Sequence, residues 1–404
     1  MIIIERLNLK GEGIAHGITA ARTLPGEEID GEIVDGRIAQ PRIVTPSAQR
    51  VSAPCRHYKA CGGCAVMHAS DAFVADWKQD VVQHALSAQG LNAAFRPLLT
   101  SPPKSRRRAT LAGRRLKSGA LVGFHARASD TVTAISDCQL LDPALLAVIP
   151  ALEELVIIGG SRKGEMKLTI TAFSQAVEVS VTGGKPLDNA LRVSLPQIAG
   201  RHGFARLAWD GDVLLQTEPP TLTMGRAQVS PPAGAFLQAT PQGEAALLAA
   251  VKEAVGEARY VADLFAGCGT FSLPLAETAE VHAVESLAAM LESLDRGWRT
   301  AKGLKRVTTE TRDLFRRPLL PDELAKYDAV VMDPPRAGAE AQVHELARAS
   351  VPIIAAVSCN PVTFARDARI LVQSGYQLDW VQVVDQFRWS AHVELVARFS
   401  RINS

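Results

Sequence analysis

From about residue 243 to the end of the chain, short apolar segments alternate with segments of helical periodicity. Five apolar runs rich in β-branched residues predict strands: YVADLF, VHAVE, RVTTE, YDAVVMD and PIIAAVS. Helices are predicted at 288–302, 339–348 and 361–374. Repeated strand–helix units fold as an open, mostly parallel sheet with helices on both faces. Ligands of such sheets bind at the carboxyl ends of the strands, so the residues that follow each run are the first candidates for function.

The first 230 residues have a different character, and 404 residues exceed one compact domain of ordinary size. Glycines and short alternating runs, with a hairpin turn signal at Asp35-Gly36, predict a small open β-barrel at the N-terminus. A helix at 70–90 and the alternating strands MKLTITAF and VEVSVTGG follow, and a Pro-rich joint precedes the α/β unit. We therefore predict three domains, at residues 1–52, 53–229 and 230–404.

Charge and hydropathy narrow the class of protein. The 44 basic residues nearly balance the 42 acidic ones, so a nucleic-acid partner requires a local basic surface. No segment approaches the roughly 20 apolar residues of a membrane helix, and the start of the chain has an acid at Glu5 and no small-residue cleavage site. Six cysteines are too few for a disulfide-stapled secreted protein. We expect a soluble cytoplasmic protein without a membrane contact.

A glycine-containing turn, Asp263 to Phe271, follows the first predicted strand of the α/β unit. Its glycines let the backbone approach a ligand, although a tight strand-to-helix turn would look the same. Glu285 ends the next strand, where an acid accepts hydrogen bonds from a ribose diol, and Asp313 follows the third strand, where it would meet an adenine amino group. The turn lacks the third glycine of dinucleotide-binding proteins. These acid positions favour S-adenosylmethionine over NAD.

A cysteine and two acids follow later strands. Cys359, in Ser-Cys-Asn-Pro, precedes a helix whose N-terminus we expect to stabilise a thiolate, although a lone cysteine also occurs as a small buried hydrophobe. Asp333-Pro334-Pro335-Arg336 forms a stiff loop beside the same predicted pocket. Glu394 lies in the apolar run HVELVARF, where a buried carboxylate is costly and is therefore either paired or catalytic.

The four remaining candidates are cysteines. Cys55, Cys61 and Cys64 have the spacing C-x5-C-x2-C, and Cys138 is the only other cysteine in the N-terminal half. Four thiolates suit either tetrahedral zinc or a [4Fe–4S] cluster, and the spacing does not choose between them. Cys268, in the glycine turn, is expected only to pack.

A basic segment lies between the third and fourth of these cysteines. It holds seven cations and no acid in fourteen residues: Lys104, Arg106, Arg107, Arg108, Arg114, Arg115 and Lys117. Such a run is commonly a solvated face, but its position beside the cysteines favours a surface that contacts RNA phosphates.

The pieces DLFAGCGTFSLPLA, MDPPRAG, VSCNPVTFARD, DQF…HVE and CRHYKACGGC together resemble the RNA uracil-5-methyltransferases, in particular the bacterial ribosomal members with an iron–sulfur cluster. The resemblance covers nearly the whole chain. It implies a C-terminal class I, Rossmann-like methyltransferase sheet, a β-rich central domain bearing the cluster, and a shortened OB-like TRAM barrel at the N-terminus. It also implies Cys359 as nucleophile, Glu394 as base and a [4Fe–4S] cluster on Cys55, Cys61, Cys64 and Cys138. The implied cofactor residues are Gln238, Phe265, Gly267, Gly269, Thr270, Glu285, Asp313 and Asp333.

The implied reaction is methylation of carbon 5 of an RNA uridine, with S-adenosylmethionine as donor, by a monomer acting on 23S ribosomal RNA. A thiolate must add at carbon 6 because carbon 5 of uracil is a poor nucleophile, and one base must then remove the carbon-5 proton. The alternatives are a transfer-RNA uridine, a non-catalytic RNA-binding protein, and methylation of a small molecule. Two departures from the family pattern concern base recognition: Gln386-Phe387-Arg388-Trp389, and Ala239-Thr240 after Gln238.

Overall fold

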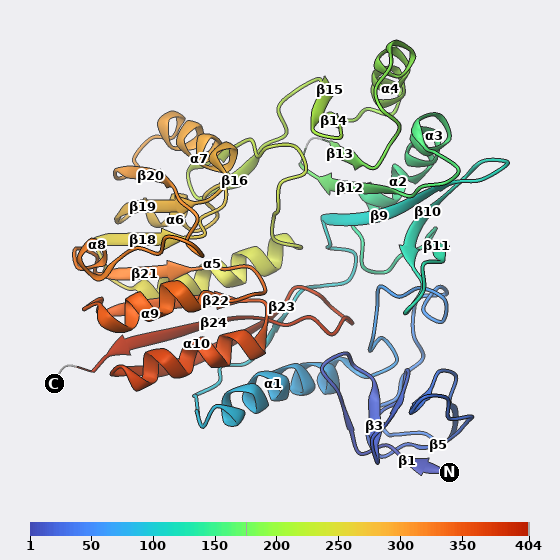
Figure 1. The fold of residues 1–404 in the computed structure, drawn as a ribbon, viewed down its shortest axis with the longest axis horizontal. Helices are drawn as coiled ribbons and strands as arrows, with labels where there is room; N and C mark the ends of the chain where they lie inside the picture. The colour runs from blue at the N-terminus through green and yellow to red at the C-terminus, as the bar shows by residue number, and fades with distance from the viewer. Residues whose placement is uncertain (175, 403–404) are drawn as a thin grey trace.

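The computed structural model describes residues 1–174 and 176–402. The C-terminal α/β unit forms one half of the molecule, and the N-terminal strands and a central sheet form the other (Figure 1). Within the described residues, no helix is long and apolar enough to cross a membrane.

The α/β unit is built on one eight-stranded sheet with the order β20-β19-β18-β21-β22-β24-β23-β8. The first five strands in this order are parallel, and β24 runs antiparallel between β22 and β23. The predicted mostly parallel sheet is confirmed. The strands are β8 (Leu99–Thr100), β18 (Tyr260–Leu264), β19 (Glu280–Glu285), β20 (Val307–Thr311), β21 (Ala329–Met332), β22 (Ile353–Ser358), β23 (Tyr376–Asp385) and β24 (Glu394–Arg401).

Helices cover both faces of this sheet because alternate strand residues point to opposite sides. Ala262 and Val330 pack in one core with helices α1, α8, α9 and α10, whereas Val261 and Val331 pack in a second core with α5, α6 and α7. The helices are α1 (Asp71–Ala88), α5 (Pro241–Val255), α6 (Ser272–Leu275), α7 (Ala288–Thr300), α8 (Pro321–Leu324), α9 (Glu340–Arg348) and α10 (Pro361–Gln373).

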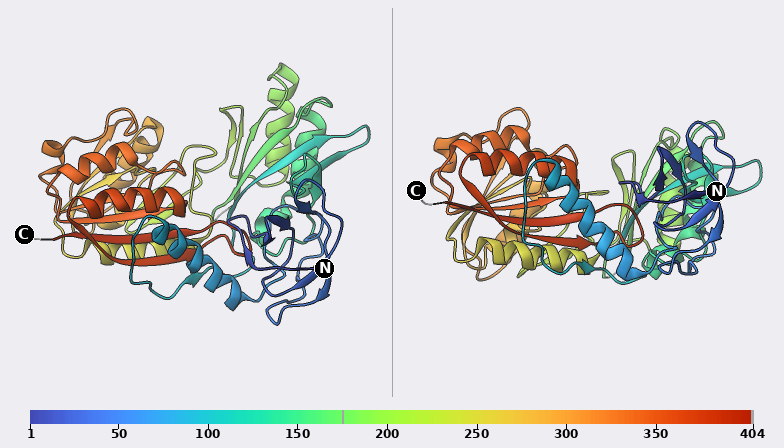
Figure 2. Two further views of the ribbon diagram at one scale, coloured as in Figure 1. Left: turned by 60° about the horizontal axis from the view of Figure 1, so that its bottom comes forward. Right: turned by 90° about the horizontal axis from the view of Figure 1, so that it is seen from below.

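Two elements from the first hundred residues belong to this C-terminal unit in space. Helix α1, capped by the Ser70 side chain, contributes Val82 and Leu86 to the core beside α10. Strand β8 pairs with the end of β23 and adds an edge to the sheet. Figure 2 shows α1 running from the N-terminal strands across to the α/β unit. Two parts of the predicted central region 53–229, α1 and β8, therefore pack with the C-terminal unit.

The central region contains a seven-stranded sheet with the order β11-β10-β9-β12-β13-β14-β15. Helices α2 (Pro143–Ala147), α3 (Ile149–Gly159) and α4 (Asn189–Arg201) accompany it, and the hairpin β16 (Leu222–Met224) and β17 (Ala227–Val229) leads to the joint before α5. The strands are β9 (Arg108–Arg115), β10 (Ala120–His125), β11 (Val132–Ala134), β12 (Met166–Ala172), β13 (Val177–Thr182), β14 (Arg206–Trp209) and β15 (Asp212–Gln216).

The N-terminal region forms two small sheets, β1-β5-β7 and β2-β3-β4-β6. Asp35 and Gly36 both have positive φ, of 49° and 70°, which confirms the predicted hairpin turn. The strands are β1 (Ile2–Ile3), β2 (Arg6–Leu7), β3 (Gly13–Ala15), β4 (Ile18–Ala20), β5 (Glu28–Asp30), β6 (Arg37–Ile38) and β7 (Arg42–Thr45).

Two arginines of the basic segment, Arg107 and Arg108, lie at the junction of the two halves rather than on a free surface. Arg107 is 7% exposed, pairs with Glu244 on α5 and donates to the Gln238 carbonyl. Arg108 donates to the carbonyls of residues 234 and 235 in the Pro-rich joint. The expected phosphate-contacting surface is therefore wrong for these two arginines, because acceptors of the protein occupy their guanidinium groups. Lys104 and Lys117 are exposed.

Candidate active site

A cavity of about 450 Å³ opens at the carboxyl ends of β18, β19, β20, β21 and β22 and reaches the first residue of β24. This is the edge of the sheet that the strand–helix pattern indicates. The predicted residues that line the cavity are Gln238, Phe265, Gly267, Thr270, Glu285, Asp313, Asp333, Cys359 and Glu394.

Strand pairing places the cysteine beside the glutamate. Strands β22 and β24 are antiparallel, and their register pairs Val357 with Val396 and Ser358 with Leu395. Cys359 directly follows Ser358 and Glu394 directly precedes Leu395, so the register brings these two residues to the same end of the strand pair, and both line the cavity. Asp333 directly follows Met332, the last residue of the neighbouring strand β21. A thiol and two carboxyl groups therefore share one end of the cavity.

The environment of Cys359 favours the neutral thiol. Burial raises the pKa of Cys359 to about 11, and the carboxyl groups of Glu394 and Asp333 add to this shift, whereas Arg336 opposes it. Desolvation and the two nearby acids thus act against the thiolate that the helix N-terminus is expected to favour.

Burial also disfavours the charged forms of the two acids at this end. Glu394 is 4% exposed, and burial raises its pKa to about 8, with Asp333 contributing and a hydrogen bond from Gln386 opposing. Burial raises the pKa of Asp333 to about 7. Gln238 donates to Asp333 at 3.3 Å and accepts from Gln386 at 2.6 Å, so an amide pair bridges the two acids. A cation bound here would favour both carboxylates.

The other end of the cavity is formed by the glycine turn and the strands beside it. The Glu285 carboxylate accepts N–H groups from Gly267 at 3.2 Å and from Leu287 at 3.0 Å. Phe265 has a left-handed φ of 62°, a strained conformation for an aromatic residue that is typical of functional sites. Its ring lies 5.6 Å from that of Phe315, so two aromatic rings flank this end.

Gly269 is the predicted cofactor residue that does not line the cavity. Its φ is 100°, and a Cβ there would come within 3.0 Å of Leu294 on α7 and of Leu273. The glycine is required for the turn to pack against α7. Cys268, expected only to pack, is buried at the cavity wall, and burial raises its pKa to about 12.

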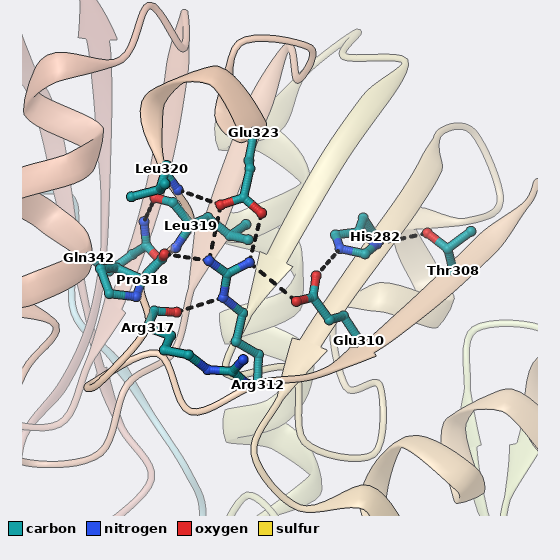
Figure 3. A network of polar contacts seen from close by, with 10 residues as sticks. All are labelled: His282, Thr308, Glu310, Arg312, Arg317, Pro318, Leu319, Leu320, Glu323 and Gln342. Carbon is teal, nitrogen blue, oxygen red and sulfur yellow. Dashed lines mark hydrogen bonds and ion pairs between the residues drawn. The ribbon is translucent and has the colours of Figure 1, made fainter.

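A polar network holds the loop that carries Asp313 and Phe315 (Figure 3). Arg312 makes a bidentate pair with Glu323 at 2.7 and 3.0 Å and donates to the carbonyls of Arg317 and Pro318. It also contacts Glu310. The planar fork of an arginine fixes such a loop in one geometry. No motif in the sequence singles out Arg312, because its partners come from three different places: β20, the loop after it, and α8.

Three further residues line the cysteine end and were not among the predicted site residues: Arg336, Phe387 and His392. Arg336 donates to His392 Nδ1 at 2.8 Å, and burial together with Arg336 lowers the pKa of His392 to about 4. The His392 ring stands edge-on to Phe387, with centroids 5.5 Å apart. A neutral imidazole and an aromatic ring thus form a wall suited to a planar base.

The four clustered cysteines line a second, smaller cavity between residues 55–67 and residues 124–140 of the central region. Gly62 donates to the His125 carbonyl at 2.9 Å, and a Cβ at this position would lie 2.8 Å from that oxygen. Burial and neighbouring thiols raise the pKa of Cys61, Cys64 and Cys138, so a bound metal would have to displace their protons. Within residues 1–174 and 176–402, no three His, Cys, Asp or Glu side chains converge on one metal-ion position.

The chain resembles known proteins over nearly its whole length. Residues 227–401 match the tRNA (uracil-5-)-methyltransferase family. An uncharacterized RNA methyltransferase of Brucella suis is 41% identical over 98% of this chain and 96% of its own. The 23S rRNA (uracil(1939)-C(5))-methyltransferase of Halomonas elongata is 32% identical over 97% and 88%.

The fold also matches a solved structure. The tRNA (uracil-54, C5)-methyltransferase of Pyrococcus abyssi, solved with S-adenosyl-L-homocysteine, has a TM-score of 0.78 over 98% of both chains at 24% identity. Taken with the cavity and the extent of the sequence matches, these likenesses place the chain in the RNA (uracil-5-)-methyltransferase family, as an enzyme of that class.

Proposed function

We propose that this protein transfers a methyl group from S-adenosylmethionine to carbon 5 of a uridine in RNA. The observation that carries the proposal is the β22–β24 register, which sets Cys359 beside Glu394 at one end of a single cavity. The opposite end holds the Glu285 carboxylate and two aromatic rings. The proposed nucleophile Cys359, the proposed base Glu394 and the proposed donor-binding residue Glu285 therefore line the same cavity.

The chain's residues suit each proton and bond of this reaction. Cys359 Sγ loses its proton and adds to carbon 6 of the uracil, so that carbon 5 becomes nucleophilic. The donor, when bound, would supply an electrophilic methyl group: as carbon 5 bonds to that methyl, the bond from the sulfonium sulfur to the methyl would break and the donor would leave as the neutral thioether S-adenosylhomocysteine. Glu394 then removes the proton of carbon 5 while the bond from Cys359 Sγ to carbon 6 breaks, which restores the ring and the thiolate.

The raised pKa values of Asp333 and Glu394 suit a site in which a bound cation restores the charged carboxylates. Asp333 and Glu394 are disposed to be neutral in the free protein because they are buried beside each other. The positive sulfonium would favour their carboxylates, so Glu394 becomes able to accept a proton when the donor is bound. The target uridine must be single-stranded or flipped, because a stacked base cannot reach a buried thiol.

The substrate we propose is 23S ribosomal RNA. This rests on the Halomonas elongata relative, whose name gives that substrate and whose identity of 32% extends over most of both chains. The name of the Pyrococcus abyssi protein gives transfer RNA as its substrate. At 24% identity its likeness to this chain concerns the fold and does not extend to the substrate. A ribosomal substrate places the reaction in the cytoplasm.

We also propose that Cys55, Cys61, Cys64 and Cys138 hold a [4Fe–4S] cluster. Four thiols facing one cavity are the donor set of such a cluster. Gly62 supports this, because its close approach to His125 shapes the loop that presents Cys61 and Cys64. Protein purified without oxygen should be brown and contain about four irons per chain. A colourless protein with one zinc would contradict this assignment.

Trapping experiments test the methyl-transfer proposal. Cys359→Ala should neither methylate RNA nor form a covalent complex with 5-fluorouridine RNA, because no group adds to carbon 6. Glu394→Gln keeps the nucleophile but lacks the base, so it should accumulate a denaturation-resistant complex with ordinary RNA. 23S and transfer RNA are compared as substrates by mapping 5-methyluridine. Methylation by Cys359→Ala would refute the thiol-addition mechanism.

A further inference from the structure

The loop between β23 and β24 forms the wall of the cavity that faces the base. It spans residues 386–393 and reaches from the sheet toward the β-rich half of the molecule (Figure 1). Phe387 and His392 line the cavity, and Glu394 follows directly as the first residue of β24. The position of this loop therefore determines where a base would lie relative to Cys359 and Glu394.

The loop is fastened to the segment that carries the cysteines. The Trp389 carbonyl accepts N–H groups from Ala65 at 2.8 Å and from Val66 at 3.0 Å, the two residues that follow Cys64. The Trp389 side chain is 6% exposed and packs in the same core as Cys138, with Cys55, Cys61 and Cys64 at its margin. These contacts join two segments more than 300 residues apart in the sequence.

The conformation of Trp389 depends on that attachment. Its φ is 60°, in the left-handed region that a bulky aromatic residue avoids unless its surroundings hold it there. Residues 51–68 form turns and isolated bridges without a helix or a named strand, so few backbone ladder hydrogen bonds hold this segment, and contacts of its side chains contribute more to its order. Arg106 adds a second link, since its guanidinium carbon lies 5.6 Å from the Phe387 ring.

We infer that the four-cysteine site is a positioning device for methyl transfer: it orders residues 61–66, which hold Trp389 and thereby place Phe387 and His392 in the cavity. The inference rests on the proposed function for the identity of the reaction and of the bound group. Trp389 is a positioning residue, because it does not line the cavity. The donor end, on β18 to β20, has no part in this attachment.

Hydrogen–deuterium exchange on the full-length protein tests the inference without relying on activity. We expect Trp389→Leu to speed amide exchange in residues 386–392 by about tenfold or more, because the strained turn loses the packing of the indole ring in the cysteine-bearing core and keeps only its backbone hydrogen bonds. Methylation of RNA should fall by about 10- to 100-fold in kcat/KM, as for a misplaced active-site wall. The Kd for S-adenosylhomocysteine should stay within about twofold, because the donor end is untouched.

Trp380→Leu is the matched control. Trp380 lies on β23 of the same hairpin, but its ring packs against Arg96 at 3.6 Å, away from the cysteines. It should change neither the exchange of 386–392 nor the methylation rate. An unchanged exchange rate in Trp389→Leu, or an equal effect of both variants, would overturn the inference.

Loss of the bound group is the second perturbation. Cys138→Ser, or removal of the metal from folded wild-type protein by a chelator, should speed exchange in residues 55–66 and 386–392 together. Faster exchange confined to 55–66 would overturn the inference. A wild-type protein that methylates no RNA would refute the proposed function instead, and the Trp389 comparison would still decide the coupling.

Discussion

Replacing Lys78 by methionine tests what holds the N-terminal helix to the C-terminal sheet. Lys78 on α1 is 0% exposed, and its Nζ lies 2.6 Å from Oδ1 of Asp385, which is 1% exposed. The same Nζ donates to the Phe387 carbonyl at 3.1 Å. Burial lowers the pKa of Lys78, and the Asp385 carboxylate opposes that shift. Methionine keeps the aliphatic stem but removes the charge, so Asp385 is left buried without its counter-ion.

The expected cost follows from this geometry. At 2.6 Å and an effective dielectric constant of about 20, the attraction between the two charges is about 6 kcal/mol, part of which offsets their desolvation. Removing one partner of such a pair destabilises a protein by about 3–5 kcal/mol. Asp385→Asn in the same chain removes the stranded charge. The double variant should therefore be less destabilised than the sum of the single variants, by about 2 kcal/mol.

Urea unfolding followed by circular dichroism measures these differences, and methylation rates report on Phe387. Lys252→Met is the matched control, because Lys252 pairs with Glu277 at 3.4 Å on the surface and its loss should cost about 1 kcal/mol or less. Lys78→Met should also lower the methylation rate, since the Phe387 carbonyl loses a donor. The reasoning would be refuted if Lys78→Met cost no more than Lys252→Met, or if the double variant equalled the sum within about 0.5 kcal/mol.

Three further predictions concern the cavity and the junction. Because the pKa of Glu394 is raised to about 8, the folded state keeps a proton that the unfolded state loses above its ordinary pKa, and stability falls as pH rises toward 8. Glu394→Gln should therefore raise the melting temperature relative to wild type more at pH 8.5 than at pH 6, and a difference independent of pH would contradict the shift. Arg312→Gln should weaken S-adenosylhomocysteine binding by about tenfold in calorimetry, because the loop bearing Asp313 loses its bidentate anchor. Arg317→Gln in the same loop should not, because that side chain is exposed and its carbonyl still accepts from Arg312. Arg107→Gln should destabilise the protein by about 2 kcal/mol through loss of its buried charged hydrogen bonds, whereas Lys117→Gln, at an exposed position, should leave stability unchanged. Equal melting temperatures of the two variants would contradict the buried position of Arg107.

The parts of the fold that the sequence predicted are those fixed by local chemistry. The runs YVADLF and PIIAAVS form β18 and β22, and the predicted helices 288–302 and 361–374 form α7 and α10. The Asp35-Gly36 turn was equally predictable, because both of its residues require positive φ. Each of these elements depends on residues that adjoin in the chain, so periodicity and turn chemistry suffice to locate them.

The contacts that the sequence did not predict are long-range. Lys78 and Asp385 are 307 residues apart, and the sequence around either residue does not indicate that the other is its partner. The arginines at 106–108 read as an exposed basic run because the acceptors that bury them, Glu244 and the carbonyls of the joint, come from a distant segment. Thr240, a departure from the family pattern, caps α5 by accepting from Gly243 and meets Ser101 at 2.7 Å.

The two ends of the cavity accordingly differ in how far local sequence motifs predict their residues. The end that we propose for the donor consists of strand termini of one sheet, and the places of Glu285 and Asp313 in the cavity were predictable because Glu285 ends β19 and Asp313 closely follows β20. The end that faces the base is formed by β22, β24 and the loop at 386–393. This region is held by contacts from α1, from residues 65–66 after Cys64, and from Arg106. On the proposed function, we expect changes in these distant segments to shift Phe387 and His392 while donor binding stays unchanged. Arg388 and Trp389 lie in this loop, so we expect their substitution to affect selection of the RNA target more than the donor site.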